Sequence, residues 1–220
     1  MKEYNYNHFS PEDYAHDSFA APKIGQRAPD FTAYTLDGKV VQLSDFFGQS
    51  VVLEIGSLTC PVYAGVLKRM RRLQKEFTEV TFLLLYVREA HPGERRGQAQ
   101  TNKAKRQRAQ ECKDIYKDPR MVLVDDVSGK AHKAYGLVPN SVFIIDRNGK
   151  IFWRAKWNQP RELRENLRRL TNNQPATGES HSELPGALRP RAFLYGGWVA
   201  VWDFIKGFHR LIWLKFLKRR

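Results

Sequence analysis

The segment from Val51 to Phe77 constrains the fold of this chain more than any other. A predominantly apolar run, Val51 to Ile55, ends in a turn of small residues, and Cys60 then stands directly before Pro61 and an amphipathic helix. The run is short and rich in β-branched residues, which is typical of a strand buried on both faces. Because proline is well tolerated at the first helical position, we expect Cys60 at or near the N-cap of the helix.

The position of Cys60 predicts a reactive thiol. At a helix N-terminus, the positive end of the helix dipole and the free backbone N–H groups favour a thiolate, which is the nucleophilic form of cysteine. The alternative is a buried, inert cysteine that only packs. The order of strand, turn, Cys-Pro and helix favours the reactive interpretation.

Strand-like and helical segments alternate along the rest of the chain. A hairpin is expected around Asp37-Gly38, and a second around Asn148-Gly149. Further strands are predicted at 80–87 and 121–124, and helices at 62–77, 101–117, 128–135 and from Pro160 to about 171. This pattern predicts an α/β fold, a central mixed sheet flanked by helices with crossover connections.

The length of 220 residues allows one ordinary domain with appendages. We expect a domain over 23–172, preceded by an N-terminal arm over 1–22 that either lies on the domain or is disordered. A linker rich in Asn, Pro, Gly and Ser follows over 173–190, and a tail occupies 191–220.

The composition narrows the range of partners. A net charge of +14 favours an anionic partner, either lipid headgroups or nucleic acid. No base-reading or phosphate-cradling motif accompanies the basic helix at 101–117, so we expect a solvated basic face there and no nucleic acid. The two cysteines and the histidines have no metal-ligand spacing, so no metal is expected. The N-terminus lacks an apolar secretory segment, which favours a cytoplasmic protein whose cysteines are thiols at rest.

The order of these elements, with the segment from Ala134 to Phe143, resembles the thioredoxin superfamily. The resemblance implies that Pro139 is a cis-proline packed against Cys60; the alternative is a trans-proline at the start of a strand. Tyr63 stands where thioredoxins have the second cysteine of Cys-x-x-Cys, which disfavours a simple dithiol exchanger. The Pro-x-x-x-Thr-x-x-Cys pattern of the peroxiredoxins (AhpC/TSA redoxins) is kept only in part, with Leu53 and Ser57 at the proline and threonine positions.

Two motifs are more similar to the iodothyronine deiodinase family, in its bacterial type with cysteine in place of selenocysteine. They are Gly56-Ser57-Leu58-Thr59-Cys60-Pro61 and Tyr86-Val87-Arg88-Glu89-Ala90-His91-Pro92. The resemblance implies that Cys60 is the catalytic nucleophile and that Ser57 and Thr59 are hydroxyl residues beside it. It also implies that Tyr86, Glu89 and His91 form a hydrogen-bonded set that delivers protons.

These residue types fit reductive removal of a halogen from a small phenolic molecule. Such a reaction needs a soft nucleophile, which Cys60 supplies, and an acid, which His91 oriented by Glu89 supplies. The same groups would serve attack on a peroxide, so a peroxiredoxin-like peroxidase is an alternative, and a non-catalytic interaction protein with a redoxin fold is another. No bound cofactor is expected. Either Cys112 resolves oxidised Cys60, or thioredoxin or a small thiol regenerates it.

The family pattern is altered at three places near this site. Leu58, Ser141 and the segment Gly93 to Gly97 replace residues that deiodinases carry there. The reaction centre can therefore be retained while the substrate pocket differs.

The tail predicts an amphipathic helix. One side collects apolar residues from Leu194 to Phe216, flanked by Trp202 and Trp213, and the chain ends in Lys218, Arg219 and Arg220. Charged residues interrupt the apolar stretch, so a bilayer-spanning helix is disfavoured. A tryptophan-rich helix with a cationic face suits the inner membrane surface, through Trp198, Trp202, Trp213 and the basic end. Docking on its own domain and contact with a partner are the alternatives.

Overall fold

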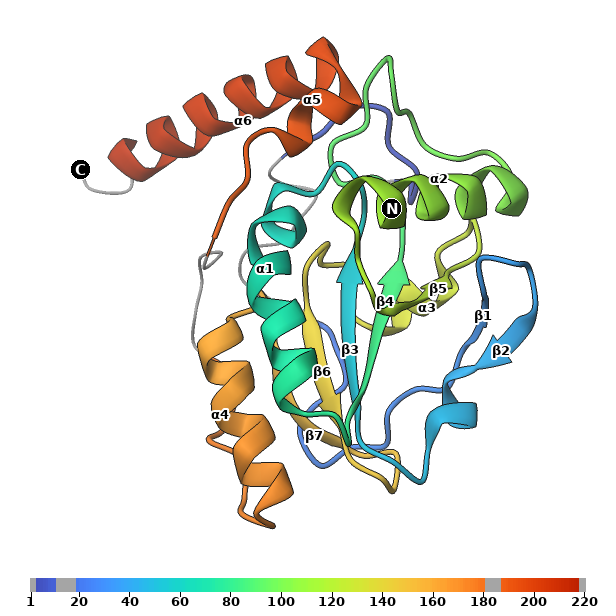
Figure 1. The fold of residues 1–220 in the computed structure, drawn as a ribbon. Coiled ribbons are helices and arrows are strands. Elements are labelled where there is room, and N and C mark those ends of the chain that lie inside the picture. Colours follow the sequence, from blue (N-terminus) through green and yellow to red (C-terminus); the bar gives the residue numbers. More distant parts are fainter. Residues whose placement is uncertain (1–2, 11–18, 181–186, 218–220) are drawn as a thin grey trace.

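The computed structural model describes residues 3–10, 19–180 and 187–217, with side chains as far as Gly207. Its centre is a seven-stranded mixed sheet in the order β2-β1-β5-β4-β3-β6-β7 (Figure 1). The strands are β1 Thr32–Tyr34, β2 Val40–Gln42, β3 Val51–Gly56, β4 Thr81–Tyr86, β5 Met121–Val124, β6 Val142–Ile145 and β7 Ile151–Ala155. The predicted α/β architecture is confirmed, as are both hairpins.

β3 and β4 form the middle of the sheet. They pair in parallel, with Val51 opposite Thr81 and Gly56 opposite Tyr86, so their carboxyl ends reach the same edge. Every residue of β3 is buried, as expected for a strand covered on both faces. Glu54 is also buried, although it is a carboxylate within this otherwise apolar strand.

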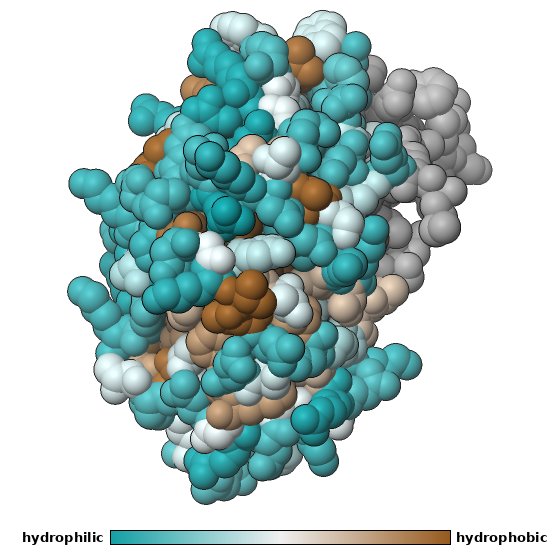
Figure 2. Space-filling view, turned by 90° about the vertical axis from the view of Figure 1, so that its right-hand side faces the viewer, coloured by the Kyte–Doolittle hydropathy of each residue, from teal (hydrophilic) through white to brown (hydrophobic). Residues whose placement is uncertain are grey.

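Helices cover both faces of the sheet. The helices α1 Pro61–Glu76, α2 Asn102–Tyr116 and α4 Pro160–Thr171 contribute apolar side chains to one face, where they meet Leu84 and Phe82 of β4. The alternate residues of β4, Leu83 and Leu85, point to the other face, which is covered by the short helix α3 Lys130–Ala134 and by residues near the N-terminal side of β1. A 3₁₀ turn, η2 Leu43–Phe46, follows β2. The surface beside α2 and the β1–β2 hairpin is largely hydrophilic, with apolar residues in small separate groups (Figures 1 and 2).

The connection before β6 differs from the expectation for a cis-proline. The described residues contain no cis peptide bond, so the bond between Val138 and Pro139 is trans and that prediction is wrong. The chain reverses before the proline, where Gly136 and Leu137 have φ of 88° and 62° and the Leu137 N–H donates to the His132 carbonyl. Since the turn is completed there, the peptide bond keeps the trans form that is lower in energy.

The tail forms two helices rather than one. Gly197, with φ of 102°, ends α5 Ala192–Gly196 and separates it from α6 Trp198–Leu217. α6 runs away from the rest of the molecule towards the C-terminus (Figure 1). Among the described residues, no helix is both long and apolar enough to cross a membrane. The side chains of Trp213, Lys218, Arg219 and Arg220, expected at a membrane surface, lie outside the described residues.

The first residues lie on the domain, one of the two alternatives expected for the arm. The Tyr6 hydroxyl donates to the Ala90 carbonyl at 2.8 Å, and the Asn5 amide donates to the Val127 carbonyl at 2.9 Å. The rings of Tyr4 and Tyr6 both contact the Arg88 guanidinium, at 4.7 and 4.6 Å from its central carbon. Residues 3–10 therefore cover the loop that follows β4.

Candidate active site

The two sequence motifs meet at the carboxyl edge of β3 and β4. The turn after β3 carries Ser57, Thr59 and Cys60, and the loop after β4 carries Glu89 and His91. Because the parallel strands end side by side, segments about thirty residues apart become neighbours. All five of these side chains are buried.

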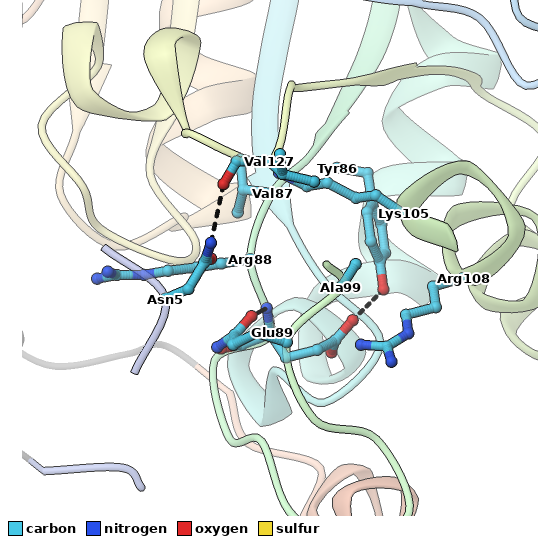
Figure 3. A pocket seen from close by; sticks show the side chains of 10 residues that line it. Asn5, Tyr86, Val87, Arg88, Glu89, Ala99, Lys105, Arg108 and Val127 are labelled. Atoms are coloured by element: carbon cyan, nitrogen blue, oxygen red, sulfur yellow. Dashed lines mark hydrogen bonds between the residues drawn. The ribbon is translucent and has the colours of Figure 1, made fainter. Parts of the chain in front are cut away.

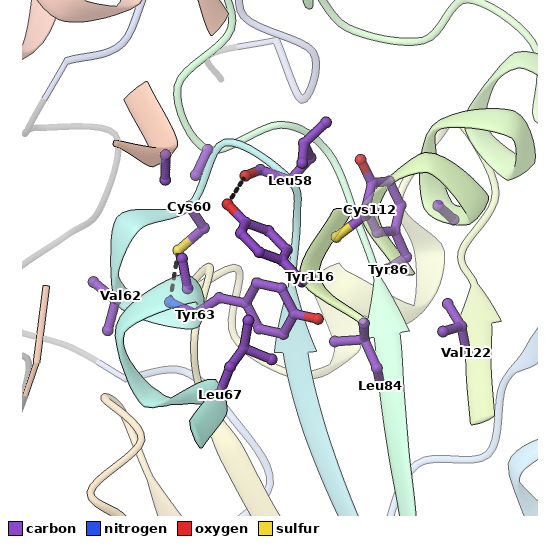
Figure 4. Packing of buried hydrophobic residues seen from close by; sticks show 14 of the residues in the cluster. Leu58, Cys60, Val62, Tyr63, Leu67, Leu84, Tyr86, Cys112, Tyr116 and Val122 are labelled. Carbon is purple, nitrogen blue, oxygen red and sulfur yellow. Dashed lines mark hydrogen bonds between the residues drawn. The ribbon is translucent and has the colours of Figure 1, made fainter. Parts of the chain in front are cut away.

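Cys60 is the N-cap residue of α1, with Pro61 at the first helical position. Its backbone is extended, at φ −84° and ψ 111°, and its Sγ accepts a hydrogen bond from the Tyr63 N–H at 3.5 Å (Figure 4). The sulfur thus replaces the oxygen that Ser or Asp commonly supplies at this position.

The environment of Cys60 opposes its ionisation. The residue is 1% exposed, and burial raises the pKa of the thiol to about 12, with the carboxylates of Glu54 and Glu89 acting in the same direction. Backbone N–H groups of Tyr63 and Val62 lower the pKa, but by less. This conformation favours the neutral thiol, because desolvation outweighs the helix terminus. The reactive thiolate at Cys60 stays a prediction.

Glu89 organises the hydroxyl residues of both motifs. Its Oε2 accepts from the Thr59 N–H at 3.0 Å and from the Thr59 hydroxyl at 2.7 Å. Its Oε1 accepts from the Tyr86 hydroxyl, as Figure 3 shows. The Ser57 hydroxyl accepts the Ala90 N–H at 3.1 Å. The structure therefore brings Thr59, Tyr86 and Glu89 into one buried network next to Cys60, and Ser57 binds the backbone of the same loop at Ala90.

His91 joins this network through its backbone rather than its ring. Its N–H donates to Thr59 Oγ1 at 3.1 Å, so Glu89 reaches His91 through Thr59 and not by the direct contact expected. Within the described residues, the buried ring Nδ1 has no hydrogen-bond partner. The ring centroid lies 4.1 Å from that of Phe9, 4.7 Å from Phe193 and 6.0 Å from Phe204. Burial lowers the pKa of His91 to about 3, so the ring is neutral.

Cys112 lies on the buried side of α2. It belongs to the same apolar cluster as Cys60, and both cysteines are free thiols. Burial raises the pKa of the Cys112 thiol well above its usual value. In Figure 4 the ring of Tyr116 lies between the two sulfur atoms. The resolving role of Cys112 stays a prediction.

A buried ionic cluster beneath α1 was missed by the sequence reasoning. Arg120, 1% exposed, pairs with Glu54 and, at 2.7 Å, with Asp118. The Tyr63 hydroxyl donates to the same Asp118 carboxylate at 2.7 Å, so the residue at the second Cys-x-x-Cys position is tied to this cluster. The signal was present in the sequence as a carboxylate, Glu54, inside an apolar strand, because such a group is buried only with partners.

A small cavity of about 10 Å³ lies on the other side of Glu89 and is lined by Tyr86, Glu89 and three cations, Arg88, Lys105 and Arg108 (Figure 3). That volume corresponds to about one water molecule. The Lys105 ammonium donates to the Asp126 carbonyl at 2.7 Å, and burial lowers its pKa to about 8. Within the described part of the chain, no group of three or more His, Cys, Asp or Glu side chains is arranged to hold a metal ion.

Comparison with known proteins supports the resemblance to the deiodinase family. The family model for iodothyronine deiodinase matches residues 5–171. The chain is 28% identical over 163 residues to the type II iodothyronine deiodinase of Rattus norvegicus, covering 60% of this chain and 61% of that protein. It is also 27% identical over 151 residues to the thiol-disulfide oxidoreductase ResA of Bacillus thuringiensis subsp. konkukian (strain 97-27), covering 68% of this chain and 79% of that protein.

Solved structures agree on the fold. An uncharacterized conserved protein from Geobacillus kaustophilus superposes with a TM-score of 0.60 at 19% identity, covering 79% of this chain and 93% of that one. A structure described as the thiol:disulfide interchange protein DsbE from Chlorobium tepidum gives a TM-score of 0.54 at 22% identity, covering 69% and 97%. The expected thioredoxin-like fold is confirmed.

Proposed function

Because this chain belongs to the iodothyronine deiodinase family of thioredoxin-like oxidoreductases, we propose that it is a thiol-dependent oxidoreductase with Cys60 as its nucleophile. The observation that carries the proposal is the position of Cys60, at the N-cap of α1 and directly after Thr59 of the Glu89 network. Glu89, Tyr86 and the hydroxyls of Ser57 and Thr59 then position the turn that carries the sulfur, and His91 handles the proton.

The proposed reaction is reductive removal of a halogen from an aromatic ring. The Cys60 thiolate attacks the halogen, the carbon–halogen bond breaks, and the ring carbon takes the electron pair and a proton. Cys60 is left as a sulfenyl halide. An external thiol displaces the halide ion to give a mixed disulfide, and a second thiol releases Cys60 in reduced form. The two electrons come from the two external thiols, which a small thiol or a thioredoxin-type dithiol supplies.

A panel of thiol-dependent assays tests this proposal. Wild type and Cys60→Ser are compared with dithiothreitol as reductant and either an iodinated phenol or hydrogen peroxide as substrate. Iodide release by wild type but not by Cys60→Ser is the expected result. Turnover of peroxide alone identifies the peroxidase instead. If wild type and Cys60→Ser behave alike with both substrates, the chain is a non-catalytic redoxin-fold protein.

We propose a peripheral location on the inner face of the cytoplasmic membrane. The support is the exposed apolar face of the tail, where Trp198 is 73% and Trp202 58% exposed, together with the net charge of +14. Co-sedimentation with phosphatidylglycerol vesicles at low salt tests this location. A chain that stays in the supernatant contradicts it.

A further inference from the structure

The tail packs against α1 and against the apolar cluster that contains Cys60. The Arg189 N–H donates to the Pro61 carbonyl at 2.9 Å, in the first turn of α1. A Cβ on Gly65 would lie 2.7 Å from the Ala187 carbonyl oxygen, so the tail backbone runs directly against α1. Ala192 of α5 belongs to the apolar cluster that contains Cys60, and Tyr195 packs against that cluster. Residues 187–196 therefore lie over the end of α1 and the cluster in which Cys60 is buried.

The same segment covers His91. The rings of Phe193 and Phe204 contact the His91 ring from α5 and α6. The backbones of the tail and of the loop after β4 also contact each other. A Cβ on Gly196 would lie 2.5 Å from the His91 carbonyl oxygen, and the Arg95 N–H donates to the Gly196 carbonyl at 3.1 Å. Both groups assigned to the proposed reaction are therefore held in unreactive forms, a neutral thiol and a desolvated imidazole, beneath one segment.

The outer face of this segment is apolar and exposed. Of the eight large hydrophobic residues exposed in the described part of the chain, five belong to it: Leu188, Leu194, Trp198, Trp202 and Ile205. The basic residues Arg189, Arg191 and Lys206 are exposed beside them. Tryptophan with flanking cations is the composition of helices that bind the interface of an anionic bilayer.

On the basis of the proposed role of Cys60, we propose that residues 187–207 form a lid over the thiol site, and that an anionic bilayer opens it by binding the exposed tryptophan face. A ligand shifts a conformational equilibrium only if it binds one state more tightly. In the closed state only the outer face is available to lipid. In the open state the inner face, with Phe193, Ala200 and Phe204, is available as well. The bilayer therefore binds the open lid more tightly than the closed one.

Alkylation kinetics of Cys60 test the lid. Wild type is treated with iodoacetamide in buffer, with phosphatidylglycerol vesicles and with phosphatidylcholine vesicles, and the Cys60 and Cys112 peptides are quantified separately by mass spectrometry. We expect slow alkylation of Cys60 in buffer and at least tenfold faster alkylation on phosphatidylglycerol, with little change on phosphatidylcholine.

Variants of the inner and outer faces of the lid separate two steps, the closure of the lid over Cys60 and its binding to the bilayer. Phe193→Ala removes a contact of the inner face and should accelerate Cys60 alkylation in buffer without vesicles. Trp198→Ser with Trp202→Ser should leave alkylation in buffer slow and abolish the acceleration by vesicles. Val40→Ser, at an exposed apolar position on β2, is the matched control and should behave as wild type.

The proposal is overturned if phosphatidylglycerol vesicles leave the Cys60 rate unchanged, if phosphatidylcholine accelerates it equally, or if Phe193→Ala reacts as slowly as wild type. Alkylation reports the access and the ionisation of the Cys60 thiol, and it does not depend on turnover of a substrate. If vesicles accelerate the alkylation of Cys60 but no iodide is released, the lid proposal is supported and the proposed function is contradicted.

Discussion

At the residue scale, the protonation state of Cys60 depends on two opposing effects, the helix terminus and burial. A helix N-terminus stabilises a negative charge by about 0.3–1 kcal/mol, whereas one pKa unit corresponds to about 1.4 kcal/mol. The rise of the Cys60 pKa from 9.0 to about 12 therefore exceeds what the helix terminus can offset. The cysteine and its cap position could be predicted from the sequence, but its burial could not, because the cluster around Cys60 includes Ala192, which is more than a hundred residues away in the chain.

His91 should make the stability of the protein depend on pH. Burial lowers its pKa from 6.5 to about 3, so the unfolded chain binds a proton at pH values where the folded chain does not. Its contribution is present above pH 6.5 and is lost as the pH falls towards 3. Between pH 7 and pH 5 the loss amounts to roughly 2 kcal/mol of unfolding free energy.

Urea unfolding of wild type and His91→Phe at pH 7 and pH 5 measures this loss. Phenylalanine keeps the contacts with the surrounding aromatic rings but cannot take a proton, so the variant should lose about 2 kcal/mol less than wild type between the two pH values. His132 is also buried with a lowered pKa and contributes equally to both proteins. Equal losses in both proteins would mean that His91 is solvated in solution.

At the element scale, the helices differ in where their caps come from. α1 and α2 are capped by the residues before them, Cys60 through its sulfur and Thr101 through a hydroxyl that accepts the Ala104 N–H at 3.1 Å. α6 is capped by Glu94, whose carboxylate accepts the Trp198 N–H at 2.6 Å and the Val199 N–H at 3.0 Å. A cap from the preceding residue determines only where a helix begins. Glu94 lies about a hundred residues before α6, so its cap also holds α6 against the domain.

Removing the Glu94 carboxylate should loosen α6. We expect Glu94→Ala to increase hydrogen exchange at the first amides of α6 at pH 7, because two backbone N–H groups lose their acceptor. Glu94→Gln keeps an acceptor oxygen without the charge and should lie between Glu94→Ala and wild type. The hydrogen bonds from Val199, from Glu94 itself and from Trp198 lower the Glu94 pKa, so the cap is present at neutral pH and is lost as the pH falls through that lowered value.

Glu79→Ala, at an exposed carboxylate before β4, is the control for a change of surface charge. Hydrogen–deuterium exchange read by mass spectrometry over 192–207 distinguishes the variants. Identical exchange in Glu94→Ala and wild type would show that the carboxylate does not hold α6 in solution.

The elements that sequence reasoning predicted correctly are those set by neighbouring residues. The strands at 51–56 and 81–86, the hairpins at Asp37-Gly38 and Asn148-Gly149, and the helix starts at Pro61 and Pro160 follow from local patterns. The break at Gly197 was missed, because a continuous helical pattern runs through it. The glycine is needed for its positive φ and for the close approach of Glu94, and neither requirement is visible in the sequence.

At the scale of the whole molecule, both ends of the chain converge on the candidate site. The His8 ring pairs with Asp203 of α6 at 3.0 Å, and the Phe9 ring contacts His91 with the ring centroids 4.1 Å apart. Tyr6 is hydrogen-bonded to Ala90, the residue before His91. The arm and the tail are thus held together over the loop after β4, so each depends on the other for its position.

Deleting residues 2–9 should therefore release the tail. The deletion removes the contact of the Phe9 ring with His91 and the His8 partner of Asp203, while leaving every residue of the sheet in place. Aromatic pairs of this kind contribute about 0.5–1.5 kcal/mol each beyond the area they bury. We expect faster hydrogen exchange over 192–207 and faster alkylation of Cys60 in buffer, with β3 and β4 as well protected as in wild type.

The double variant His8→Ala, Phe9→Ala in the full chain should reproduce both effects, since it removes the same two contacts. If the tail stays as protected in these variants as in wild type, it docks without the arm, and the two ends cover the site independently.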